Sequence, residues 1–186
     1  TDKADFADCD MVIEAVFEDM DLKKSIFKEL DAICKPGAVL ASNTSALDNN
    51  EIASVTSRPE SVIGMHFFSP ANVMKLLENV RGDQSSDSVV ATTMAIGKQI
   101  GKVSAWAGNT DGFVANRSRG PFTAEASILL EDGALPEQVD KVLTDFGYPM
   151  GPFAVGDLAG LDIGWAVRKR KAAEDLQKLV TDALVE

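Results

Sequence analysis

The chain has 186 residues, of which 45% are hydrophobic and 25% charged, a balance that is ordinary for a globular protein with a buried core. Its formal net charge of −11 argues against nucleic acid as a partner, because binding phosphates requires a basic face. Two cysteines form neither a metal-ligand spacing nor a disulfide framework, so no metal site is predicted. No apolar run approaches the length of a membrane span.

The first third of the sequence alternates between two kinds of pattern. Short apolar runs predict strands, and apolar residues at helical spacing predict helices. Strand, helix, strand, helix, strand is typical of a parallel sheet with crossover helices. The strands are expected at residues 11–16, 38–41 and 62–66, and the helices at residues 22–33 and 51–55.

The third of these strands leads into His66, the only histidine in the chain. Glu78 follows it within another apolar run, residues 73–80, which is expected to be a fourth strand. A carboxylate can orient an imidazole and determine which ring nitrogen carries the proton, so the two residues form a candidate acid–base pair. The alternative is that His66 is a core histidine whose nitrogens bind backbone groups.

Polar residues follow the ends of three successive predicted strands. Glu18 follows the first, Asn43 and Ser45 follow the second, and His66 lies at the end of the third. The carboxyl ends of parallel strands meet at one edge of a sheet, and ligands bind there in open α/β folds. This arrangement favours a binding site over the alternative, which is ordinary polar loops without a function.

The pattern changes after Gly108. Before it, a helix is predicted at residues 89–100 and a last strand at residues 102–106. After it, only helical patterns occur, which predicts an α/β domain at 1–108 and an all-α domain at 109–186. The helices are expected at residues 113–130, from Pro136 to Gly147, and in two later stretches.

One expected motif is missing. A dinucleotide-binding fold normally opens with a strand and a Gly-x-Gly-x-x-Gly turn, whereas this sequence contains no Gly-x-Gly. The first predicted strand instead has the pattern of a middle strand of such a sheet. Either the sheet binds something else, or the chain lacks the amino-terminal part of the fold.

Seven motifs in order make the chain similar to a known family. It resembles the 3-hydroxyacyl-CoA dehydrogenases, and most closely the dehydrogenase part of multifunctional enoyl-CoA hydratase/3-hydroxyacyl-CoA dehydrogenase proteins of fatty-acid β-oxidation. Any one motif would be weak evidence, but seven at matching spacing are specific. The motifs occupy residues 13–18, 42–47, 64–70, 73–78, 111–117, 147–153 and 157–162.

The resemblance implies a fold and a place within a longer protein. Residues 1–108 would be the C-terminal half of a Rossmann-like dinucleotide-binding domain, whose Gly-rich unit would lie before Thr1. Residues 109–186 would be the helical C-terminal domain, truncated at its end. Such an internal fragment is expected to be inactive on its own.

The resemblance also implies an activity, the NAD-dependent oxidation of (S)-3-hydroxyacyl-CoA to 3-oxoacyl-CoA. His66 matches the family's catalytic base and Glu78 the carboxylate paired with it, while Ser45 and Asn116 match residues that hold substrate oxygens. Five further residues match positions that contact the cofactor. These are Ala15, Glu18, Lys23, Asn43 and Ser69, the last of which replaces an asparagine of the monofunctional relatives.

Partners and location follow from the same resemblance. It implies an acyl-CoA substrate, a homodimer or fused or associated hydratase and thiolase units, and a bacterial cytoplasmic or eukaryotic peroxisomal location. The basic run at residues 168–171 is more typical of a solvated helix face than of a site for coenzyme A phosphate. Trp106 and Trp165 are expected to be core residues.

Two other functions remain open. One is a hydrolase with a Ser45, His66 and Glu78 triad, although Ser45 lies in Asn-Thr-Ser-Ala and not in a Gly-x-Ser-x-Gly elbow. The other is a structural role without catalysis, because relatives of this fold serve as lens proteins. The presence of both His66 and Glu78 favours an enzyme over this second alternative.

Overall fold

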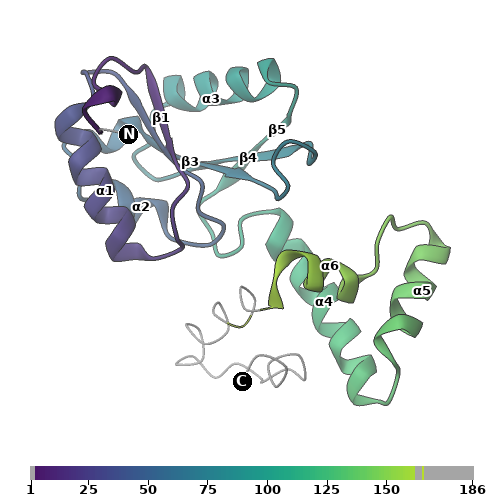
Figure 1. Cartoon of the computed structure of the whole chain (residues 1–186). Coiled ribbons are helices and arrows are strands. Elements are labelled where there is room, and N and C mark those ends of the chain that lie inside the picture. The colour runs from purple at the N-terminus through teal and green to yellow at the C-terminus, as the bar shows by residue number, and fades with distance from the viewer. Residues whose placement is uncertain (1–2, 162–164, 166–186) are drawn as a thin grey trace. The chain divides into compact units, whose positions relative to one another are not determined.

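The computed structural model describes residues 3–161 and Trp165 of the chain. The chain divides into two compact units, residues 1–117 and residues 118–186 (Figure 1). The basic run at residues 168–171 and the last predicted helical stretch lie outside the described residues.

The first unit is built on a five-stranded sheet in which the strands lie side by side in sequence order. β1, β2 and β3 are parallel, as the alternating pattern predicted, but β4 runs antiparallel to β3 and parallel to β5. A parallel pair of strands needs a long crossover connection, and only a loop joins β3 to β4, so these two strands are antiparallel. The helix α3 provides such a crossover between β4 and β5. The strands are β1 (Met11–Glu14), β2 (Val39–Ser42), β3 (Val62–Phe67), β4 (Leu76–Arg81) and β5 (Val103–Gly108).

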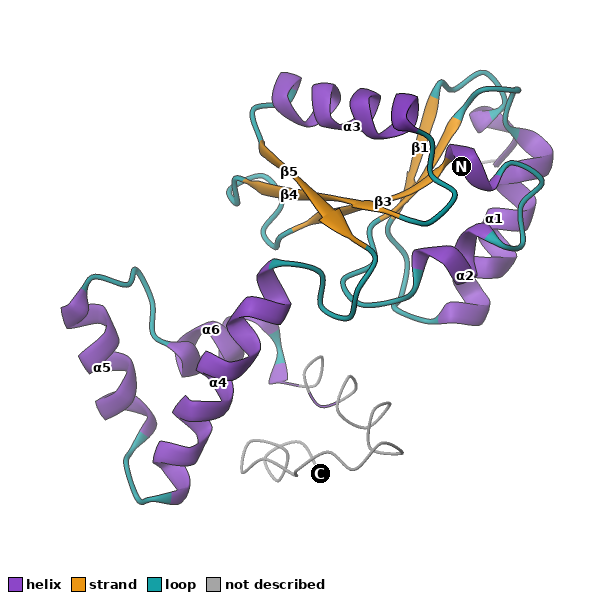
Figure 2. Cartoon of the chain, turned by 180° about the vertical axis from the view of Figure 1, so that it is seen from behind, coloured by secondary structure: helices purple, strands orange, loops and turns teal. Residues whose placement is uncertain are grey.

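Helices cover both faces of this sheet (Figures 1 and 2). α1 (Met20–Ile33) and α2 (Asn49–Ala53) lie on one face, and α3 (Asp87–Gln99) lies on the other. Two short 3₁₀ helices, η1 (Lys3–Phe6) and η2 (Pro59–Ser61), complete the unit. The predicted helices therefore exist, with ends shifted by a few residues.

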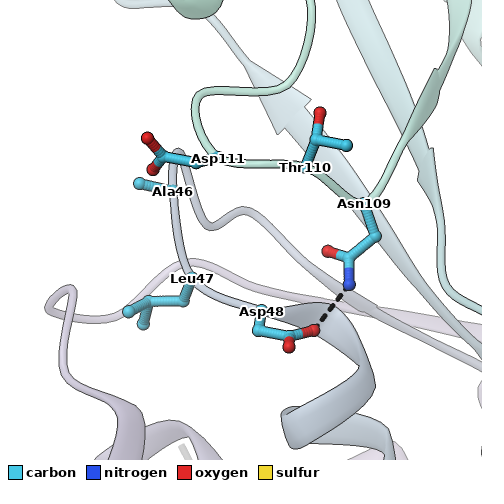
Figure 3. A pocket seen from close by; sticks show the side chains of 6 residues that line it. All are labelled: Ala46, Leu47, Asp48, Asn109, Thr110 and Asp111. Carbon is cyan, nitrogen blue, oxygen red and sulfur yellow. Dashed lines mark hydrogen bonds between the residues drawn. The ribbon is translucent and has the colours of Figure 1, made fainter.

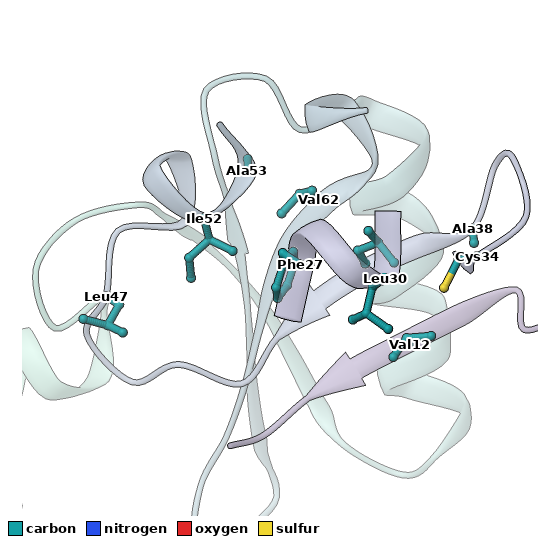
Figure 4. Close-up of a cluster of buried hydrophobic side chains, with 10 residues drawn as sticks. Val12, Phe27, Leu30, Cys34, Ala38, Leu47, Ile52, Ala53 and Val62 are labelled. Atoms are coloured by element: carbon teal, nitrogen blue, oxygen red, sulfur yellow. The ribbon is translucent and has the colours of Figure 1, made fainter. Parts of the chain in front are cut away.

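Neighbouring residues of a strand point to opposite faces of a sheet, and the core divides accordingly. Leu40 and Val62 pack with Phe27 of α1 and Ile52 of α2 in the cluster drawn in Figure 4. Their neighbours in the same strands pack on the other face, together with Val89 of α3. The strands are thus apolar on both faces, as expected for a sheet covered by helices on each side.

The second unit contains helices that end at glycines, as the sequence predicted. Gly133 follows α4 (Ala115–Glu131) and Gly147 follows α5 (Pro136–Phe146), with φ angles of 98° and 118°. In this left-handed conformation glycine has no Cβ penalty. α6 (Pro152–Ala159) begins where the backbone N–H groups of Phe153 and Ala154 donate to the carboxylate of Asp140, at 2.9 and 2.8 Å.

Two sequence-based expectations need correction. Trp106 lies in β5 with 62% of its surface exposed, so the prediction that it is a core residue is wrong. Helix α4 begins at Ala115 and not at Phe113, because Gly112 and Phe113 both have positive φ angles, 69° and 49°, which are incompatible with a right-handed helix.

The part of the chain that the structure describes contains no helix with the length and hydropathy of a membrane span.

Candidate functional site

His66 and Glu78 are brought together by the pairing of β3 with β4. They lie directly opposite each other in this antiparallel pair, so their side chains are in contact although the two residues are distant in sequence. His66 Nδ1 lies 2.8 Å from Glu78 Oε2, and the two residues are 6% and 1% exposed. The predicted proximity of these two side chains is therefore confirmed.

The second carboxylate oxygen of Glu78 binds the backbone at the start of α4. Oε1 accepts hydrogen bonds from the N–H groups of Val114 and Ala115, at 3.0 and 2.8 Å. A buried carboxylate is costly unless its oxygens are hydrogen-bonded, and the amino-terminal end of a helix favours negative charge. Each oxygen of Glu78 therefore has a partner, which holds the carboxylate in one orientation.

Two aromatic rings lie close to the imidazole of His66. The ring of Phe68 lies 4.3 Å away, centroid to centroid, and that of Phe113 lies 5.7 Å away in an edge-on arrangement. Because a carboxylate only accepts hydrogen bonds, Nδ1 must be the nitrogen that donates to Glu78. In the neutral ring, Nε2 is then a proton acceptor, which is the form required of a general base.

Glu18 organises the loop that follows β2. Its Oε1 accepts hydrogen bonds from the hydroxyl of Thr44 at 2.7 Å and from the N–H and hydroxyl of Ser45 at 2.8 and 3.2 Å. Burial by itself would raise the pKa of Glu18, but these hydrogen bonds and the charge of Lys23 together lower the pKa below its ordinary value. The hydroxyl of Ser45 thus donates to Glu18, which gives no support to a triad with His66.

Lys23 is completely buried, and sequence reasoning missed its main partner. Its Nζ lies 2.7 Å from Glu14 Oε1 and 3.5 Å from Glu18 Oε2. Glu14 also accepts hydrogen bonds from the hydroxyl of Ser42 and the N–H of Val16, at 2.7 and 2.6 Å. The available signal was a glutamate inside an otherwise apolar strand, because a carboxylate at a buried strand position requires a partner.

The other predicted site residues lie near the same edge of the sheet. Asn43 follows β2 and binds the last residues of β1 and β3. Its N–H donates to the carbonyl of Glu14 at 2.7 Å, and its side-chain oxygen accepts from the N–H of Phe67 at 2.8 Å. Ala15 and Ser69 are exposed just beyond β1 and β3. Asn116 is exposed in the first turn of α4.

A separate small pocket lies beside these residues (Figure 3). It has a volume of about 170 Å³ and is lined by Ala46, Leu47, Asp48, Asn109, Thr110 and Asp111. Across it, the side-chain amide of Asn109 donates a hydrogen bond of 2.5 Å to Asp48 (Figure 3). None of the predicted site residues lines this pocket, so it does not define the predicted active site.

Comparison with protein families accounts for nearly the whole sequence. Residues 1–110 match the family described as 3-hydroxyacyl-CoA dehydrogenase, NAD binding domain. Residues 112–185 match the family described as 3-hydroxyacyl-CoA dehydrogenase, C-terminal domain.

Individual proteins agree with this match. The chain is 59% identical to the peroxisomal bifunctional enzyme of Danio rerio, over 89% of this chain and 23% of that protein. It is 43% identical to the fatty acid oxidation complex subunit alpha of a Psychrobacter species, over 86% of this chain and 22% of that protein. It thus spans about a quarter of the length of the relatives it matches.

A solved structure provides the comparison of folds. The 3-hydroxybutyryl-CoA dehydrogenase of Escherichia coli superposes with a TM-score of 0.90 at 38% identity, over 99% of this chain and 41% of that one. The chain therefore belongs to the 3-hydroxyacyl-CoA dehydrogenase family and consists of an NAD-binding domain with a Rossmann-like α/β sheet, followed by the helical C-terminal domain.

Proposed function

We propose that the chain is the dehydrogenase part of a multifunctional enzyme of fatty-acid β-oxidation, which oxidises (S)-3-hydroxyacyl-CoA to 3-oxoacyl-CoA with NAD. The observation that carries this proposal is the buried pair of His66 and Glu78, with 2.8 Å between Nδ1 and Oε2. Family membership and the names of the relatives support the same activity.

His66 acts as the general base in this proposal. With Nδ1 bound to Glu78, its Nε2 takes the proton of the substrate's 3-hydroxyl group. The carboxylate of Glu78 stabilises the imidazolium that forms, and its contacts with Val114 and Ala115 keep it in place. NAD, when bound, supplies the hydride acceptor.

Ser45 and Asn116 would hold the substrate oxygens. The side-chain amide of Asn116 can donate a hydrogen bond to an oxygen, whereas the hydroxyl of Ser45 would have to turn from Glu18 to the substrate, while the Ser45 N–H keeps its bond to the Glu18 carboxylate. Removal of either donor is expected to raise the barrier to reaction more than it weakens binding, if the bond strengthens as charge develops on the oxygen.

Residues at the strand ends fit one end of a dinucleotide. Glu18 has a lowered pKa and a side chain that is 34% exposed, so it presents an ionised acceptor to ribose hydroxyl groups. Lys23 acts through Glu18, since its ammonium group is buried between two carboxylates. Ala15, Asn43 and Ser69 are placed at the same edge and would complete the contacts with the nicotinamide end.

These residues do not fit the pyrophosphate, which binds backbone N–H groups at a glycine-rich turn. The sequence has no Gly-x-Gly that could form this turn. We therefore propose that residues 1–108 are the C-terminal half of the dinucleotide-binding domain and residues 109–186 the truncated helical domain. The meeting of the two family matches between residues 110 and 112 supports a boundary in this region.

Partners and location are proposed from the relatives. The name of the Danio rerio enzyme supports a peroxisomal location in a eukaryotic cell, and that of the Psychrobacter subunit supports a fatty acid oxidation complex in a bacterium, for which we propose the cytoplasm. In either setting we expect hydratase and thiolase units to be fused to or associated with the parent protein, or the parent protein to form a homodimer.

The test is the substitution His66→Gln in the parent enzyme. Loss of a general base lowers turnover by about 10² to 10⁴-fold, while NADH binding should be unchanged because the imidazole acts on the substrate. Steady-state turnover of acetoacetyl-CoA and titration with NADH measure the two effects. Lys24→Gln, which removes an ion pair between α1 and Glu51 of α2, is the control and should retain full turnover. Near-normal turnover of His66→Gln would mean that His66 is a core residue.

A further inference from the structure

The backbone just before α4 has an unusual conformation at Gly112 and Phe113. Phe113 has a φ of 49°, which is rare for a residue with a bulky side chain, and it follows Gly112, whose φ is 69°. Hydrogen bonds from Phe113 N–H to the Thr110 carbonyl, at 2.9 Å, and from Arg117 N–H to the Gly112 carbonyl, at 3.0 Å, close the turn on both sides. Unfavourable conformations of this kind persist where the surrounding structure holds them, often at functional sites.

This turn directs three consecutive residues toward the two members of the acid–base pair. Phe113 is 2% exposed and packs against Val80 and Ala107, and its ring forms a T-shaped pair with the imidazole of His66, 5.7 Å between centroids. The next two backbone N–H groups, those of Val114 and Ala115, point to Oε1 of Glu78. One side of the segment therefore contacts the base, and the other contacts the carboxylate that orients it.

We infer that residues 113–115 are a positioning segment for the acid–base pair, in which Phe113 supplies the side chain and Val114 and Ala115 supply the N–H groups. The N–H groups hold Glu78 so that Oε2 faces Nδ1, and the Phe113 ring keeps the imidazole from turning away from that oxygen. This role deepens the proposed function, because it concerns the group that we assign as general base. Phe113 itself reaches no reacting atom in this scheme.

The inference depends on geometry at both nitrogens of His66. If the imidazole turns, Nδ1 loses its acceptor, and the neutral ring no longer prefers to carry its proton on Nδ1. A mixture of the two tautomers then places a proton on Nε2 in part of the molecules, and these molecules cannot accept the substrate proton.

The experiment uses the fact that the chain contains one histidine. Nitrogen-15 labelling of histidine gives a spectrum of His66 alone, recorded at a pH above which the nitrogen shifts no longer change, so that only the neutral ring is observed. We expect the unsubstituted chain to show one nitrogen carrying a proton, Nδ1. Phe113→Leu should give averaged nitrogen shifts from mixed tautomers, and Phe113→Tyr, which keeps the ring, should retain the single form.

The matched control is Phe27→Leu, the same substitution at a phenylalanine that is 0% exposed in the core beneath α1. It should lower stability without altering the His66 spectrum. The inference is overturned if Phe113→Leu keeps the single Nδ1–H form, or if Phe27→Leu mixes the tautomers equally. If Phe113→Leu does not fold, Phe113→Gly replaces it, because glycine adopts a positive φ without strain.

Activity of the parent enzyme separates this inference from the proposed function. Phe113→Leu should lower kcat by about 10 to 10²-fold, with KM for NADH unchanged, because it misplaces the base and leaves the cofactor contacts alone. If Phe113→Leu mixes the tautomers but His66→Gln keeps its turnover, the proposed function fails and the positioning role stands. If His66→Gln is inactive but Phe113→Leu leaves both tautomer and kcat unaltered, the positioning role fails and the proposed function stands.

Discussion

Buried charged side chains in the first unit occur in pairs. Glu78 is bound to His66, and Glu14 to Lys23, each at 2.7 to 2.8 Å between the nearest atoms. Removal of one partner from a buried ion pair leaves an uncompensated charge, which costs more than the pair itself contributes. The ion pair of Lys23 with Glu14, the last residue of β1, therefore allows this cost to be measured.

We predict that Glu14→Gln strongly destabilises the first unit. The ammonium group of Lys23 would lose its nearest carboxylate while remaining buried, which lowers the free energy of unfolding by about 3 to 5 kcal/mol. The matched control is Glu51→Gln, which breaks the exposed pair of Glu51 with Lys24 and should cost about 1 kcal/mol or less. Urea unfolding of both variants is the measurement, and equal losses would show that Lys23 finds other compensation.

Among the contacts between elements, Arg58, which precedes β3, forms several hydrogen bonds with the carboxyl-terminal end of α1. Its guanidinium donates to the carbonyls of Asp31, Cys34 and Lys35, and its Nε donates to the carboxylate of Asp31 at 2.7 Å. The last carbonyls of a helix lack partners within the helix, so one arginine stabilises the whole terminus. Asp31 also accepts hydrogen bonds from the N–H and hydroxyl of Ser57, at 2.6 and 3.1 Å.

This network predicts a loss of stability in acid. Burial would raise the pKa of Asp31, but the hydrogen bonds from Arg58 and Ser57 and the charge of Arg58 lower it below the ordinary value of 3.8. A carboxyl group whose pKa is lower in the folded than in the unfolded state stabilises the fold fully above its unfolded pKa. This contribution is lost as the pH falls through the folded pKa.

In the unsubstituted chain, the free energy of unfolding should decrease as the pH falls below about 4. We expect this decrease to be smaller in Asp31→Asn and in Arg58→Gln. Denaturant unfolding at a series of pH values measures the slope. Thr92→Ala, which removes an uncharged exposed hydrogen bond within α3, serves as the control and should shift the curve without changing its slope. An unaltered slope in both network variants would show that Asp31 does not contribute to acid sensitivity.

For the molecule as a whole, the sheet ends in a strand whose apolar side chains are exposed. β1 is the outermost strand of the described sheet, and Ile13, Val16 and Phe17 in and after it are 41%, 41% and 87% exposed. An apolar sheet edge of this kind can pair with another chain. The sequence also contains no Gly-x-Gly turn of the kind that anchors a pyrophosphate.

We predict that the 186-residue chain by itself binds NADH weakly or not at all, is inactive as a dehydrogenase, and tends to associate. In our proposal Glu18 and Asn43 contact one end of the cofactor and Lys23 acts through Glu18, while the sequence has no Gly-x-Gly turn to supply backbone donors for the pyrophosphate. Titration calorimetry with NADH and light scattering test binding and association together, with the parent enzyme as the control. A monodisperse chain that binds NADH at micromolar concentration would contradict this prediction.

The sequence by itself determined the order of strands and helices, the helix ends at Gly133 and Gly147, and the candidates His66 and Glu78. These features depend on local patterns, namely side-chain periodicity and the backbone freedom of glycine.

Only the tertiary structure decided the reversed direction of β4, the pairing of Lys23 with Glu14, and the contact of Glu78 with the start of α4. Each of these depends on which distant segment lies opposite a given residue. A buried polar group must find some partner, but the register of the strands and the path of the turn at Phe113 determine which one it finds.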